Sequence, residues 1–129
     1  MFLNQSAFYM LGRNSDKIRT EEERSKTLKC CNDLQLDGIV IVGASHTLTD
    51  VAHLANYMIE HNSKTRVIGV PASIDNNIAH QKLEASIGFA TSSHTYSTLI
   101  SNLMIDASSN TKYWYFIRLM GRDPSHLAL

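Results

Sequence analysis

The sequence predicts an α/β fold, in which a parallel sheet carries helices on both of its faces. Short apolar runs that end in glycine or proline are typical of strands buried in a parallel sheet, and they alternate with longer stretches that have helical spacing. The predicted order is helix, strand, helix, strand, helix, strand. Crossovers between parallel strands of this kind are right-handed.

Local signals mark the first helix and the first strand. Thr20 and Glu23 have the spacing of a capping box, in which each side chain bonds to the backbone amide of the other residue. This pair predicts a helix over residues 21–34. The apolar run 37–42, which Gly43 closes, predicts a buried strand.

The second helix and the second strand follow directly. Apolar residues at helical spacing predict a helix that ends near His61; they are Val51, Leu54, Ala55, Met58 and Ile59. Residues 66–70 predict another buried strand. Pro71 ends it, because proline has no amide to donate to an interior ladder.

The third helix lies between residues 84 and 109. Its apolar stripe is the clearest in the chain and comprises Tyr96, Leu99, Ile100, Leu103, Met104 and Ala107. The aromatic run 113–119 predicts a third strand beside the other two. Residues 123–125, Asp-Pro-Ser, predict the start of another helix.

The predicted topology nominates a binding site. In Rossmann-like sheets, ligands bind in the crevice beyond the carboxyl ends of the strands. Three loops should therefore meet at one edge, namely residues 43–47, 71–77 and 120–123. We expect Ser45, Asp75 and Arg122 to lie together in that crevice.

Composition excludes several classes of function. The 129 residues suit a single domain, and 12 basic residues balance 12 acidic ones. This balance argues against a nucleic acid or an anionic membrane as the main partner. No apolar run is long enough to span a membrane, and the N-terminus lacks a basic leader. The adjacent Cys30 and Cys31 are unlike a disulfide pair and indicate reduced thiols in a cytoplasmic protein.

Residues of these three loops, together with Arg13, allow two interpretations, one functional and one purely structural. The small residues after Gly43 could let backbone amides approach a phosphate, or could form a plain turn. Asp75 could act as a general base toward a hydroxyl, or could satisfy its own turn. Arg122, and with less support Arg13, could bind phosphate or lie free on the surface. The six histidines show no zinc-binding spacing.

Three segments carry a family resemblance: LDGIVIVGASHT, TRVIGVPASIDNN and YFIRLMGRDPSHLAL. In this order and spacing they resemble the phosphofructokinases, above all the long pyrophosphate-dependent branch. The resemblance extends from about Phe8 to Leu129. It implies a partial phosphofructokinase domain over residues 1–129, taken from a longer enzyme of glycolysis. That enzyme would phosphorylate the 1-hydroxyl of fructose 6-phosphate from pyrophosphate or ATP, and this segment alone would be inactive.

The resemblance also implies roles for single residues. Asp75 lies in the counterpart of the T-I-D-x-D motif and would deprotonate the sugar hydroxyl. The implied sugar-phosphate contacts are Ser73, Asn77, Met120, Gly121 and Arg122. The implied contacts to the phosphate donor are Arg13, Gly43, Ala44, Ser45 and Thr47. The family uses Mg²⁺ beside the transferred phosphate.

The sequence departs from the family pattern at the metal side. Ser45 replaces the aspartate of the family's GGD motif, so the expected magnesium ligand is absent. His46 replaces the next acidic residue of the branch, Ala72 replaces a lysine, and Asn77 replaces the second aspartate of T-I-D-x-D. Phosphoryl transfer relies on metal and positioned charge, and these groups are lost while Asp75 is kept.

Three hypotheses follow. The chain is a piece of an active phosphofructokinase, or a catalytically degenerate copy that regulates through subunit or domain contacts, or a separate small phospho-ligand module. Three motifs in register disfavour the third. The first two imply fructose 6-phosphate and pyrophosphate or ATP as ligands, and a homo- or hetero-oligomer as the assembly.

Overall fold

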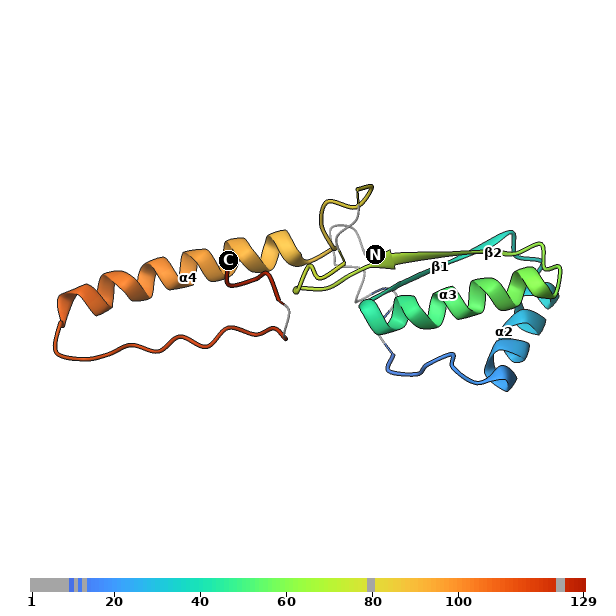
Figure 1. The fold of residues 1–129 in the computed structure, drawn as a ribbon, viewed down its shortest axis with the longest axis horizontal. Coiled ribbons are helices and arrows are strands. Elements are labelled where there is room, and N and C mark those ends of the chain that lie inside the picture. Colours follow the sequence, from blue (N-terminus) through green and yellow to red (C-terminus); the bar gives the residue numbers. More distant parts are fainter. Residues whose placement is uncertain (1–9, 11, 13, 79–80, 123–124) are drawn as a thin grey trace.

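The fold is built around two parallel strands. The computed structural model describes residues 10, 12, 14–78, 81–122 and 125–129. Its elements follow in the order α2 (Glu21–Asp33), β1 (Gly38–Gly43), α3 (Ser45–Glu60), β2 (Arg66–Pro71) and α4 (Phe89–Ser109). β1 pairs with β2 in parallel, and α3 forms the crossover between them (Figure 1). The predicted α/β class and the first two strands are confirmed.

The capping box at the start of α2 is formed as the sequence predicts. The Thr20 hydroxyl accepts from the Glu23 amide at 3.2 Å, and the Glu23 carboxylate accepts from the Thr20 amide at 2.8 Å. The same carboxylate accepts from the Arg19 amide at 2.8 Å. These bonds, with the Thr20 amide first, lower the pKa of Glu23 because they favour its charged form.

The core lies on one face of the sheet. Cys31 of α2 and Leu54 and Met58 of α3 are buried there against half-buried side chains of both strands. On the opposite face, the side chains Val40, Val42 and Ile68 are 63%, 56% and 56% exposed. The expectation that both strands are buried on both faces is therefore wrong. Alternation of inward and outward side chains along β1 produces this result.

α4 is formed, but its apolar stripe is not buried. None of its 21 residues is buried, and Leu99 and Met104 are 51% and 64% exposed. Gly88 precedes α4 with φ of 96°, in the left-handed region that glycine tolerates. Among the described helices, α4 included, none combines the length and apolarity needed to cross a membrane.

The third strand is a wrong prediction. Residues 113–119 form neither a helix nor a strand, and the sheet has the order β1-β2 within the described residues. This segment runs back toward the sheet, opposite in direction to α4 (Figure 1). Trp114 and Phe116 are 90% and 94% exposed. The aromatic pattern indicates an extended conformation, but a strand also needs a neighbouring ladder. The predicted helix start at residues 123–125 lies partly outside the described residues.

Candidate functional site

The loop after β1 is compact because Gly43 and Thr47 lie against each other. A Cβ atom on Gly43 would lie 2.5 Å from Cγ2 of Thr47, so only glycine fits without moving the first turn of α3. Ala44 is the N-cap residue of α3 and supplies no side-chain cap. The first amides of α3 thus have no side-chain acceptor in this loop, and Ser45, the first residue of α3, is exposed.

The loop after β2 carries the half-buried Asp75 in a tight turn. The Asp75 amide donates to the Ser73 hydroxyl at 3.1 Å. Asn76 follows with φ of 49°, a left-handed conformation that asparagine tolerates better than most residues. The Ala72 amide donates to the Gly43 carbonyl at 2.9 Å. This bond holds the second loop beside the first at the carboxyl ends of the strands.

The third loop reaches Asp75 from far along the chain. The Arg122 amide donates to Oδ1 of Asp75 at 3.2 Å, and the His126 amide donates to the Asp75 carbonyl at 3.0 Å. Gly121 has φ of 140°, and a Cβ there would lie 2.8 Å from the Ser125 hydroxyl and 3.3 Å from Oδ1 of Asp75. A glycine is therefore required where this loop passes the carboxylate. The side chains of Met120 and Arg122 are exposed.

The structure thus unites part of the predicted site. Asp75 and Arg122 are in contact, and Ser73 supports the turn of Asp75. Among the described residues, no hydrogen bond joins Ser45 to Asp75 or to Arg122; the Gly43 carbonyl makes the link between the first two loops. Asn77 is exposed next to the turn. Arg13 lies outside the described residues.

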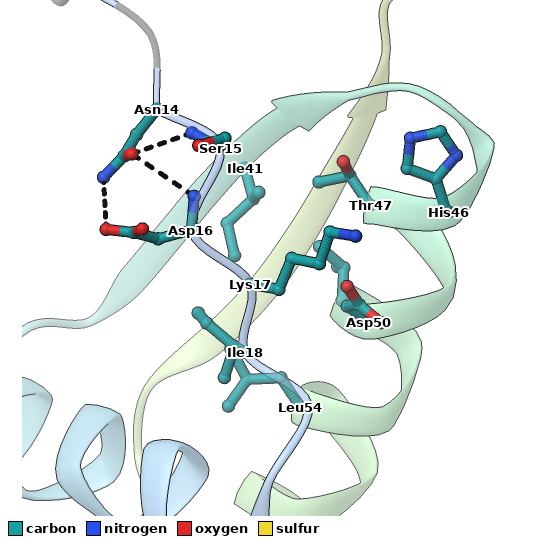
Figure 2. Close-up of a pocket in the computed structure, with 11 residues that line it drawn as sticks. Asn14, Ser15, Asp16, Lys17, Ile18, Ile41, His46, Thr47, Asp50 and Leu54 are labelled. Carbon is teal, nitrogen blue, oxygen red and sulfur yellow. Dashed lines mark hydrogen bonds between the residues drawn. The ribbon is translucent and has the colours of Figure 1, made fainter.

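A cavity of about 260 Å³ lies beside the first loop. It lies between the segment 14–18 and α3, and its apolar lining consists of Ile18, Ile41, Val51 and Leu54. Figure 2 shows the Lys17 side chain reaching from this segment toward the first turns of α3, where Thr47, His46 and Asp50 lie. The Asp16 carboxylate is turned away toward Asn14, whose side-chain amide donates to it at 2.7 Å.

An ion pair fastens the wall of this cavity. Nε of Arg19 donates to both carboxylate oxygens of Asp50, at 3.2 and 3.3 Å. The Asp50 side chain is 15% exposed, whereas that of Arg19 is 52% exposed, so the pair lies at the surface and water screens it in part. It ties the segment ahead of α2 to α3 and keeps the cavity wall in place.

Lys17 and Asp50 carry no signal in the sequence that marks them as cavity residues. Lys17 precedes every predicted element, and the Arg19–Asp50 pair joins residues 31 positions apart. No local periodicity reports such a pair. The family resemblance marks His46 only as a substitution, and the structure places it on the cavity wall.

The donor set at this edge does not fit a magnesium ion. Mg²⁺ prefers carboxylate oxygens, and Ser45 supplies a neutral hydroxyl where the resemblance implies a carboxylate. Oδ1 of Asp75 is engaged by the Arg122 amide. In the described part of the chain, no three His, Cys, Asp or Glu side chains gather into a group that could hold a metal ion.

Comparisons with known proteins agree with the sequence motifs. The phosphofructokinase family profile matches residues 4–129. The chain is 48% identical over 99% of its length to pyrophosphate–fructose 6-phosphate 1-phosphotransferase subunit alpha 2 of Arabidopsis thaliana, and covers 21% of that protein. It is 42% identical over 98% of its length to the pyrophosphate–fructose 6-phosphate 1-phosphotransferase of Entamoeba histolytica, and covers 23% of it.

The potato enzyme gives a further comparison. Over 99% of its length, the chain is 40% identical to subunit beta of the Solanum tuberosum pyrophosphate–fructose 6-phosphate 1-phosphotransferase, of which it covers 22%. The chain therefore spans about a fifth of the length of the curated relatives it matches. The family match covers nearly all of the chain, and the three motifs lie within it in register. This chain belongs to the phosphofructokinase family.

Proposed function

We propose that the chain is a segment of a longer protein that transfers a phosphoryl group from pyrophosphate, or ATP, to the 1-hydroxyl of fructose 6-phosphate. The names of its relatives support this reaction and favour pyrophosphate as the donor. The segment covers about a fifth of the length of those relatives, so the remaining parts of the reaction site would come from elsewhere in the longer protein.

One observation carries the proposal: the hydrogen bond from the Arg122 amide to the Asp75 carboxylate. In the proposed site, Asp75 accepts the proton of the sugar 1-hydroxyl as that oxygen attacks phosphorus. The exposed guanidinium of Arg122 binds the 6-phosphate, a role that suits its planar donors. Ser73, Asn77, Met120 and Gly121 complete the sugar-phosphate side.

The phosphate donor would bind at the first loop. Gly43, Ala44, Ser45 and Thr47 precede or open α3, where backbone amides without side-chain acceptors favour an anion. Thr47 also lines the cavity that Lys17 enters. Arg13, which the family resemblance also assigns to the donor, precedes the cavity segment in sequence.

A second candidate function is favoured by the loss of two carboxylates that the family pattern has in this site. Ser45 and Asn77 are neutral where the family pattern has carboxylates. Such a segment would keep sugar-phosphate binding, which needs only a cation, and lose the metal-assisted transfer. In this alternative the segment regulates a partner site through subunit or domain contacts. Several relatives are named as alpha and beta subunits, which implies oligomers among them.

The cellular setting follows from the cysteines and the substrates. Cys30 is exposed and unpaired, which suits a reducing compartment. We therefore expect the intact protein in the cytoplasm, where sugar phosphates are metabolised.

The test is fructose 6-phosphate binding by the intact protein, measured by calorimetry. Arg122→Ala should weaken binding about tenfold to a hundredfold, because a charge-assisted contact to phosphate is lost. The matched control is Arg118→Ala, an exposed arginine four residues earlier, which should change the affinity by less than about twofold. Equal losses in both variants would contradict the assignment. A parallel assay with pyrophosphate or ATP as the sole donor identifies the donor.

A further inference from the structure

The loop that carries Asp75 is held in place by two residues further along the chain, Ser86 and Ile87, which we name the bridging segment. Ala72 forms a parallel bridge with Ile87. The Ile87 amide donates to the Pro71 carbonyl at 3.0 Å, and the Ser73 amide donates to the Ile87 carbonyl at 3.0 Å. The bridging segment therefore extends the sheet by one short contact at the end of β2.

The side chain of Asn76 holds the other residue of the bridging segment, Ser86. Oδ1 of Asn76 accepts a hydrogen bond from the Ser86 amide at 2.9 Å. Ser86 is 3% exposed, so its amide has no water to replace a lost acceptor. Asn76 thus ties the loop after β2 to Ser86, while Ile87 bonds the same loop through its backbone, so both residues of the bridging segment are hydrogen-bonded to it.

Asn76 meets two requirements at this position. Its φ of 49° needs a residue that tolerates the left-handed region, and the Ser86 amide needs a side-chain oxygen. Glycine meets the first requirement only, whereas aspartate meets both. The neighbouring Asp75 carboxylate points to the Arg122 amide, so a loop released from the bridging segment would loosen that contact.

We propose that Asn76 is a positioning residue: by bonding the buried Ser86 amide, it holds Asp75 where its carboxylate bonds Arg122 and completes the sugar-phosphate site. This inference rests on the proposed function, in which Asp75 and Arg122 serve fructose 6-phosphate. In this role Asn76 acts through Asp75 and needs no contact of its own with the sugar or the phosphate donor.

The test compares three variants of the intact protein. Asn76→Gly keeps the backbone freedom and loses the acceptor, while Asn76→Asp keeps both. Asn62 is the matched control, because it is an exposed asparagine with φ of 53° in the turn after α3. Asn62→Gly reports what the same change does to the protein away from the site.

The first measurement is amide hydrogen exchange of the peptide that contains Arg122. Asn76→Gly should accelerate this exchange about tenfold, the equivalent of one lost hydrogen bond. Asn76→Asp and Asn62→Gly should leave it within about twofold. The proposal would be overturned if this peptide exchanged at the wild-type rate in Asn76→Gly. It would also be overturned if Asn76→Gly and Asn76→Asp accelerated the exchange equally.

The second measurement is the dissociation constant for fructose 6-phosphate. Asn76→Gly should raise this constant about tenfold, and Asn62→Gly should leave it unchanged. A purely structural role for Asn76 would instead lower the folded fraction and leave the constant unchanged. Asn76→Asp is read by exchange alone, because its added charge repels the sugar phosphate. An unchanged constant in Asn76→Gly would overturn the positioning role. Failure of the wild-type protein to bind the sugar would instead overturn the proposed function.

Discussion

The carboxylate of Asp75 accepts a hydrogen bond at 3.2 Å from the backbone amide of Arg122, a residue 47 positions further along the chain. The sequence placed both residues at one edge of the sheet through a third strand ending at residue 119. The structure brings them together without that strand, because an extended segment returns from the end of α4 to the loop after β2.

Gly121→Ala should break this relationship. The added Cβ would lie 2.8 Å from the Ser125 hydroxyl and 3.3 Å from Oδ1 of Asp75, at a φ of 140°. We expect fructose 6-phosphate affinity to fall about tenfold, the equivalent of one lost hydrogen bond. Gly88→Ala is the control, since it imposes a positive φ with no atom within 4 Å of the new Cβ. Calorimetry that finds the same affinity in both variants would disprove the steric explanation.

Leu54→Ala should destabilise the core strongly. Leu54 is 0% exposed and lies at the centre of the contacts between α2, α3 and the sheet. Removal of a buried leucine side chain costs about 2–5 kcal/mol of unfolding free energy. Ile59→Ala, on the same helix but at a side chain that is 65% exposed, should cost less than about 1 kcal/mol. Urea unfolding followed by circular dichroism measures both, and similar losses would contradict the assigned core.

The adjacent cysteines should react at different rates. Cys30 is exposed and Cys31 is buried. Desolvation, and secondarily the neighbouring Cys30, raise the pKa of Cys31, so less of its reactive thiolate forms. We expect iodoacetamide at pH 8 to modify Cys30 at least about tenfold faster than Cys31. Mass spectrometry distinguishes the two sites, and Cys30→Ser should remove the fast phase. Equal rates would show that Cys31 is accessible.

Acidification should weaken the start of α2. The pKa of Glu23 is lowered in the folded chain, chiefly by the Thr20 amide bond. A group of this kind stabilises the fold above its unfolded pKa, and the contribution is lost as the pH falls through the lower folded pKa. Thermal unfolding at pH 7 and pH 3 should therefore show a smaller acid-induced loss in Glu23→Gln than in wild type. Glu60→Gln, at the exposed end of α3, should behave like wild type.

Local signals predicted the elements whose causes are local. The capping box at Thr20, the glycine at the end of β1 and the proline at the end of β2 each act within a few residues, and their elements begin and end close to the predicted positions. Local signals do not predict that one face of the two strands is exposed. Val40 and Ile68 are as apolar as core residues, and only the tertiary arrangement decides that they are exposed.

The loop positions predict that Asp75 and Arg122 lie together, and the hydrogen bond between them confirms that placement, while their roles stay predictions. Asn76, Lys17 and Asp50 act through contacts with residues 10 or more positions away or through the wall of a cavity. A pattern of residue types along the chain carries no record of such contacts.

The turnover of the intact protein carrying Asp75→Asn tests the central claim most directly. In the proposed function, Asp75 is the base that accepts the proton of the sugar 1-hydroxyl, so turnover with pyrophosphate should fall about a hundredfold or more in this variant. In the alternative, the segment binds sugar phosphate, but its own site contributes little transfer because Ser45 replaces a metal-binding carboxylate. Turnover within about twofold of wild type would therefore contradict the role of Asp75 as the base and would favour the regulatory function.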